Sequence, residues 1–164
     1  MSIKRYLATK DNTITNAFKS NLETRGTGSN MGLSDVTEVF SLYGQTTSGS
    51  SGTKTTELSR ILYQFPITSS ANNILSDRNN SEIPASGSVS FFLKLYNAKH
   101  AFTLPRDFTL MVSAVSRSWS EGIGLDMEEY TDLNTSNWIN SSNGVAWTNY
   151  GGDYHASPSY SASF

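Results

Sequence analysis

Apolar and polar residues alternate along two stretches in the middle of the chain, 87–96 and 107–117, where an apolar residue recurs at every second position. The side chains of a strand point alternately to its two faces, so each stretch is predicted to be a strand with one buried face. The apolar sets that share a face are Val89, Phe91, Leu93 and Leu95 in the first stretch, and Phe108, Leu110, Val112 and Ala114 in the second.

Shorter apolar runs predict further strands on either side of these two. The segments between them are rich in Ser, Thr, Asn and Gly, the residues that turns require. Two such segments, 25–34 and 44–56, are predicted to be loops because they combine several glycines with Ser and Thr. Strands are expected at 3–7, 13–18, 35–43, 57–67 and 160–164, a short aromatic run at 145–150, and one helical turn at 71–75.

The composition narrows the fold class. A length of 164 residues suits one folded domain, which we predict to span 1–164. Aromatic residues make up 12% of the chain, which disordered chains do not reach. With the strand pattern, this predicts an all-β fold: a jelly-roll-type antiparallel β-sandwich of about eight strands with long loops. The strand pattern continues to Phe164, so we expect either that the sequence is the N-terminal part of a longer chain or that a partner supplies a final strand.

Charge and cysteine content exclude several function classes. The formal net charge is −2, which argues against a nucleic-acid-binding surface. The chain has no cysteine, so it forms no disulfide and has no thiol nucleophile or thiolate metal ligand. No apolar stretch reaches the length of a signal peptide core or a membrane span. We therefore predict a protein made in a host cytoplasm without a signal peptide and without membrane insertion.

Four acidic residues in the stretch 121–143 form a candidate metal site. Calcium prefers several carboxylate and carbonyl oxygens, and sandwich modules often hold it in a loop. The spacing does not match an EF-hand loop, so a solvated acidic loop is the alternative. The same carboxylates could also be proposed as a glycosidase pair, but the sequence does not show the separation such a pair needs. No catalytic residue is assigned, and no enzymatic activity is predicted. The four residues are Asp126, Glu128, Glu129 and Asp132.

Aromatic residues gather in the last third of the chain and are the candidate ligand-binding or partner-binding groups. Flat rings exposed on a rigid loop can stack on sugar faces or anchor a protein partner. Trp119 and Trp147 are expected to be buried. Trp138, Tyr150 and Tyr154 are expected to be exposed and to bind.

Several sequence blocks resemble a known family. Residues 57–67 (E-L-S-R-I-L-Y-Q-F-P-I) resemble the strand pattern S-R-x-Y-L-x-F-D-L, and 87–95 resemble G-x-x-x-S-A-x-L-x-L. The pattern V-x-x-x-W-x-E-G-x-x-T-W is matched by Val115, Trp119, Glu121 and Gly122, with its last Trp at Trp147 after an insertion. These patterns occur in the DNRLRE family of β-sandwich domains, which are related to carbohydrate-binding modules. The resemblance implies a sandwich fold and core positions for Trp119 and Trp147.

Three other blocks, 3–18, 27–32 and 122–132, are similar to virion proteins of tailed bacteriophages. This resemblance implies a non-enzymatic structural protein of the virion: a capsid decoration, neck, tail or fibre component. Such a protein acts through assembly with other virion proteins, as a homo-oligomer or array. The alternative is a carbohydrate-binding or adhesin module that recognises a cell-surface or extracellular polysaccharide.

Overall fold

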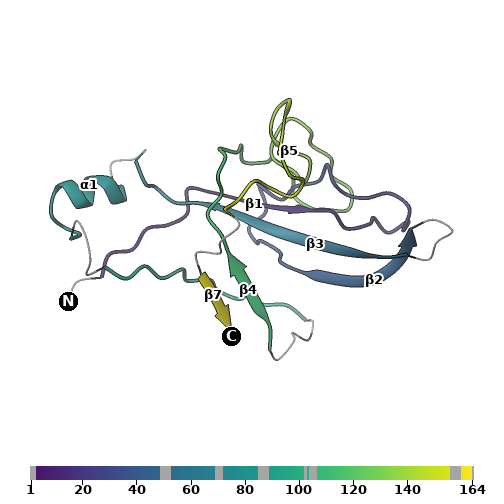
Figure 1. Ribbon diagram of the computed structural model, residues 1–164, viewed down its shortest axis with the longest axis horizontal. Coiled ribbons are helices and arrows are strands. Elements are labelled where there is room, and N and C mark those ends of the chain that lie inside the picture. The colour runs from purple at the N-terminus through teal and green to yellow at the C-terminus, as the bar shows by residue number, and fades with distance from the viewer. Residues whose placement is uncertain are drawn as a thin grey trace. The chain divides into compact units, whose positions relative to one another are not determined.

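The computed structural model (Figure 1) describes residues 3–48, 53–68, 72–84, 89–101, 103, 107–155 and 160–163. Strands in antiparallel pairs account for nearly all the regular structure there, with one short helix, which is an all-β class of fold. The elements are β1 (Lys10–Thr15), β2 (Ser41–Ser48), β3 (Thr53–Gln64), α1 (Ile74–Asn79), β4 (Thr109–Val112), β5 (Asn140–Ser142), β6 (Val145–Ala146) and β7 (Tyr160–Ser163). They form a three-stranded sheet β1-β3-β2 and the two-stranded pairs β4-β7 and β5-β6.

Contacts divide the chain into two compact units. The first unit contains Met1–Lys10 and Tyr63–Ala101, and the second contains Asp11–Leu62 and Phe102–Phe164. That 1–164 forms a single domain stays a prediction. Throughout the described ranges, no helix has the length and apolar character that crossing a membrane requires.

The first unit is built around α1. The side chain of Asn73 caps the helix by accepting a hydrogen bond from the Ser76 N–H at 2.7 Å. Lys4 forms an ion pair with Asp77 at 2.6 Å, and Tyr6 donates a hydrogen bond to the same carboxylate. These contacts hold the segment around residues 3–7 against the helix. That segment is irregular, so the strand predicted there is wrong, and the helical turn predicted at 71–75 is instead α1.

The alternating stretch in the first unit does not form the predicted strand. Residues 89–96 have no regular secondary structure, and residues 87 and 88 lie outside the described part of the chain. Its large apolar side chains are exposed, up to 88% for Phe92 and 75% for Tyr96. A strand needs a neighbour to complete its backbone hydrogen bonds, and no described strand pairs with this segment. The prediction of a buried face is therefore wrong for these residues.

The second unit contains the β2–β3 hairpin. Ser41 pairs with Leu58 and Ser48 with Thr53, with a register shift between Tyr43 and Thr47. The loop predicted at 44–56 is therefore wrong over 44–48 and 53–56, where Thr suits a strand because of its branched β-carbon. Residues 49–52 lie outside the described ranges.

The other predicted strands of the second unit differ from the observed ones in their bounds. The strand predicted at 35–43 begins only at Ser41, the one predicted at 13–18 overlaps β1 over 13–15, and the one predicted at 57–67 corresponds to β3. The stretch 107–117 contains only β4, which pairs with β7 so that Leu110 lies opposite Ala162. The terminal strand is confirmed over Tyr160–Ser163.

Three tryptophans dominate the apolar core of the second unit. Trp119, Trp138 and Trp147 cluster with Ile14 and Leu62, and Leu58 packs against the cluster. The burial predicted for Trp119 and Trp147 is confirmed. The exposure predicted for Trp138 is wrong, because this ring is only 7% exposed.

Fully buried asparagines complete this core. Asn12 donates to the Ser136 carbonyl at 3.0 Å and hydroxyl at 2.8 Å and accepts from the Met31 N–H at 2.9 Å. Asn137 accepts from the Asn140 N–H at 2.8 Å, and its carbonyl accepts from the Trp147 indole at 2.8 Å. Asn12 ties two irregular segments to β1, and Asn137 ties the segment before β5 to Trp147, so polar contacts as well as apolar packing hold this core.

Candidate ligand-binding hollow at the loop 148–154

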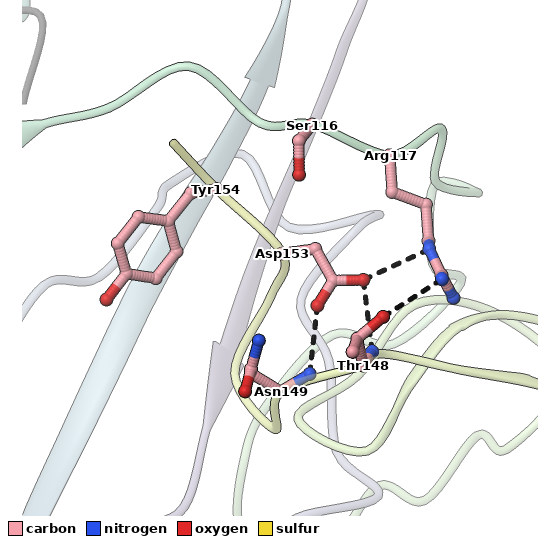
Figure 2. A pocket seen from close by; sticks show the side chains of 6 residues that line it. All are labelled: Ser116, Arg117, Thr148, Asn149, Asp153 and Tyr154. Atoms are coloured by element: carbon pink, nitrogen blue, oxygen red, sulfur yellow. Dashed lines mark hydrogen bonds and ion pairs between the residues drawn. The ribbon is translucent and has the colours of Figure 1, made fainter. Parts of the chain in front are cut away.

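The loop 148–154 folds around one carboxylate. Asp153 accepts hydrogen bonds from the backbone N–H groups of Thr148 at 3.0 Å and Asn149 at 2.9 Å (Figure 2). Gly151 and Gly152 have φ values of 88° and 111°, a conformation that side chains with a β-carbon rarely adopt. The sequence Gly-Gly-Asp therefore produces a tight loop closed by its own acidic side chain.

Arg117 anchors this loop from a neighbouring segment. Its Nε lies 3.0 Å from Asp153 Oδ2, and its other nitrogens donate to the Ala146 carbonyl at 2.6 Å and the Thr148 hydroxyl at 3.1 Å. The backbone N–H of Thr148, and to a smaller extent the Arg117 charge, hold the pKa of Asp153 below its usual value. Asp153 is therefore ionised at neutral pH and fixes the loop.

Arg60, on β3, lies close to two aromatic rings. Its guanidinium carbon is 5.1 Å from the ring centre of Trp138 and 5.1 Å from that of Tyr154. Its Nη1 donates to the Gly151 carbonyl at 2.7 Å. A β-carbon at Gly151 would lie 2.8 Å from the Trp138 ring, so only glycine allows the loop to approach this closely. The buried Trp138 thus supports Arg60, which in turn supports Tyr154.

Backbone contacts fix the position of Tyr154. It forms a β-bridge with Val115, and the flanking residues Asp153 and His155 bond to Ser116 at 2.9 Å and Ala114 at 3.0 Å. In Figure 2 the Tyr154 ring points to one side of the loop and the Asp153 carboxylate to the other, toward Arg117. The ring is therefore presented on a rigid backbone.

Two shallow hollows of about 300 and 330 Å³ lie side by side at this loop and share Asn149 and Tyr154. The first is also lined by Ser116, Arg117, Thr148 and Asp153, and the second by Arg60, Tyr150 and Gly152. Tyr150 is 66% exposed and Tyr154 40% exposed. Each volume is near the lower end of small-molecule sites, about 300–1,000 Å³. The geometry can thus hold a small polar ligand against an aromatic face.

The structure brings together two of the three predicted aromatic residues. Tyr150 and Tyr154 line the second hollow, whereas Trp138 lies beneath it under Arg60. Sequence reasoning missed Arg60, which lies 91 positions from its partner Gly151. It also missed Asn149, which the run of turn residues at 149–153 could have indicated.

The four predicted calcium ligands do not converge. Asp126 accepts from the backbone of Glu128 at 2.9 Å and Glu129 at 2.7 Å, while Glu128 accepts from the Ser20 N–H at 2.7 Å. Asp132 is buried and accepts from the Thr135 hydroxyl at 2.8 Å. Within the described ranges, no three acidic or histidine side chains are grouped as metal ligands would be. Each of the three bonded carboxylates has a local role in holding its loop, and calcium binding stays a prediction.

The pKa directions of these carboxylates agree with that role. The backbone N–H of Glu129 is the main cause that lowers the pKa of Asp126, and hydrogen bonds from Ser20 lower that of Glu128. Hydrogen bonding to the charged form stabilises it. Both groups are therefore ionised at neutral pH and act as acceptors within the fold.

No family model, curated protein or solved structure matches this chain.

Proposed function

We propose that this protein is a non-enzymatic structural protein that acts through protein–protein assembly, as a component of the virion of a tailed bacteriophage. The sequence resemblance suggests the setting. The observation that carries the assembly proposal is the exposed apolar segment 89–96 of the first unit. The proposed partners are neighbouring copies of the chain or other virion proteins.

The exposed side chains of this segment suit a strand that pairs with another chain. Phe91, Leu93 and Leu95 share one face by the alternation of a strand, and Phe92 and Tyr96 share the other. All five are exposed. Large aromatic side chains of this kind bury about 150–250 Å² each when a partner covers them. Isolated exposed apolar residues are common, but five large ones within residues 91–96 are typical of an interaction site.

The same segment supports a more specific proposal for the all-β fold, a jelly-roll-type sandwich of about eight strands. Seven strands lie in the described residues, and 87–96 has the alternating pattern of another. In this proposal the segment becomes a strand when a neighbouring sheet edge supplies its hydrogen bonds, because unpaired edges readily accept another chain.

Sedimentation velocity over a wide range of protein concentration tests the proposal. We expect the wild-type chain to self-associate, or to bind an isolated virion component, and the double variant Phe91→Ser/Leu93→Ser to lose this association. The matched control is Ile123→Ser/Leu125→Ser, which removes two apolar side chains of similar exposure from the second unit. A wild-type chain that stays monomeric and binds no virion component would refute the proposal. So would equal effects of the two double variants.

A density map of the native particle provides a second test. We expect this chain in a regular array on the capsid or tail, with 89–96 against a neighbouring chain. A location only at a distal tip, with 89–96 facing solvent, would contradict assembly through this segment.

A further inference from the structure

The two hollows at the loop 148–154 combine aromatic rings with a side-chain amide that is available for hydrogen bonding. Tyr150 and Tyr154 present their rings at the surface, and the flat ring of a tyrosine can stack on the apolar C–H face of a sugar. Among the described residues, the side-chain amide of Asn149 has no hydrogen-bond partner, although its backbone N–H bonds to Asp153. An amide that offers both a donor and an acceptor suits adjacent sugar hydroxyls.

The second hollow also holds an unneutralised positive charge. Arg117 forms an ion pair with Asp153 at 3.0 Å, but Arg60 has no carboxylate within ion-pair distance in the described part of the chain. Arg60 uses Nη1 for the Gly151 carbonyl, and its guanidinium carbon lies 5.1 Å from the ring centres of both Trp138 and Tyr154, so its position is restrained. A guanidinium held in this way still has further N–H groups, which match a carboxylate in a bidentate geometry.

We propose that this pair of hollows binds a saccharide that carries a carboxylate, such as a uronic acid. Its carboxylate would meet Arg60, its ring would lie against Tyr150 or Tyr154, and its hydroxyls would bond to Asn149. The volume of about 330 Å³ suits a single sugar ring, and the adjoining hollow of about 300 Å³ provides space for a second. The site lies within the second unit and does not depend on the assembly segment of the first.

Other ligand classes fit these hollows less well. An apolar ligand needs an enclosed, mainly apolar pocket, whereas these hollows are shallow and lined by Asn149, Arg60 and Asp153. A nucleic acid needs a positive surface that tracks its phosphates, and the chain has a net charge of −2. A carboxylated sugar would use Arg60, the cation that lines the second hollow, together with the rings.

Titration of the ¹⁵N-labelled full chain with glucuronate tests this proposal. We expect shifts of the Asn149 side-chain amide and the Gly151 and Gly152 N–H signals, with saturation-transfer signals from the sugar ring protons. Glucose has the same ring without the carboxylate and is expected to bind about tenfold more weakly, because it lacks the charge-assisted contact. Acetate supplies the carboxylate without the ring and is likewise expected to bind more weakly.

Variants assign the binding to individual residues. Tyr150→Ala and Asn149→Ala are each expected to weaken glucuronate binding severalfold while glucose and glucuronate remain distinguishable. Arg60→Lys keeps the charge but removes the bidentate geometry, so it is expected to reduce the preference for glucuronate over glucose. The matched control is Tyr43→Ala, which removes a well-exposed tyrosine outside the hollows and is expected to leave binding unchanged.

Three results would overturn the proposal: no binding of glucuronate, equal binding of glucuronate and either glucose or acetate, or equal effects of Tyr150→Ala and Tyr43→Ala. If Arg60→Lys does not fold, the effects of Tyr150→Ala and Asn149→Ala and the comparison of glucuronate with glucose and acetate still test the proposal. Assembly measured by sedimentation is independent of this outcome, so the two proposals fail separately.

Discussion

Replacing Asn12 with alanine tests whether buried amides hold the core of the second unit. Asn12 is fully buried on β1 and bonds to the carbonyl and hydroxyl of Ser136 and to the Met31 N–H. After the substitution the two oxygens of Ser136 lose this donor, whereas the Met31 N–H keeps a second contact, to the Thr13 carbonyl at 3.2 Å. A buried polar group left without its partner costs about 1–3 kcal/mol.

With two such groups, we expect Asn12→Ala to lower the free energy of unfolding by about 2–4 kcal/mol, a large share of the roughly 5–15 kcal/mol of a typical domain. For a chain of this size the midpoint of thermal unfolding should fall by about 5–15 °C.

Urea unfolding followed by tryptophan fluorescence measures this loss. All three tryptophans lie in the core cluster of the unit that contains Asn12, so their emission reports the relevant transition. The control is Asn134→Ala, which removes an exposed amide from a loop and should change the stability by less than about 0.5 kcal/mol. A loss below about 1 kcal/mol for Asn12→Ala, or equal losses for the two variants, would refute the role assigned to the buried amide.

Three further outcomes follow from the same structure. Gly151→Ala should destabilise the loop, because its φ of 88° disfavours a side chain and the new methyl group would clash with Trp138; quenching of tryptophan fluorescence by acrylamide should increase. Asp153→Asn should unfold more easily than wild type at neutral pH. The folded-state pKa of Asp153 is lowered, so its contribution is complete above the ordinary value near pH 4 and is lost as the pH falls toward the folded value. Urea midpoints of the two proteins should therefore converge in acid, and a constant difference would contradict this assignment. Asp77→Ala removes the carboxylate that Lys4 and Tyr6 share, so amide hydrogen exchange around residues 4–7 should accelerate.

Alternation predicted strands well where the strand has a neighbour in the same chain. The pattern at 160–163 corresponds to β7 because β4 pairs with it, and part of the pattern at 107–117 corresponds to β4 for the same reason. The stronger pattern at 87–96 forms no strand over its described residues. Periodicity indicates which face of a strand is apolar, but it does not indicate whether the covering partner belongs to the same chain.

The strand β1 was only partly predictable, because its burial does not alternate. Asn12, Thr13, Ile14 and Thr15 are all buried, so both faces of the strand are covered. Polar side chains tolerate this position because each finds a partner: the Thr13 hydroxyl accepts from the Glu38 N–H at 3.0 Å, and the Thr15 hydroxyl donates to the Leu58 carbonyl at 2.8 Å. Sequence reasoning treats Asn and Thr as turn and surface residues, and nothing local distinguishes a buried one whose partner lies far along the chain.

Of the candidate site, only the exposed aromatic residues could be predicted from the sequence. Tyr150 and Tyr154 could be identified because aromatic residues in a polar loop are uncommon. Arg60 could not, since its position depends on packing between Trp138 and a loop about ninety positions away. Trp138 was misplaced for the same reason: its polar neighbours in sequence suggest exposure, whereas in space its ring packs in the apolar cluster with the Arg60 guanidinium over it.

The polar core and the hollow are physically connected through Asn137 and Trp138. The Asn137 carbonyl accepts the Trp147 indole N–H at 2.8 Å, which fixes the backbone from which the Trp138 ring extends, and the Trp138 N–H bonds to the Thr27 carbonyl at 3.1 Å. That ring and the Tyr154 ring both lie within cation–π distance of the Arg60 guanidinium. A loss of order around Asn137 would therefore release Trp138 and the guanidinium. It would also loosen the loop of Tyr150, because the Gly151 N–H bonds to the Trp138 carbonyl at 2.7 Å. The positions of the positive charge and of the outer aromatic ring thus both depend on buried amides.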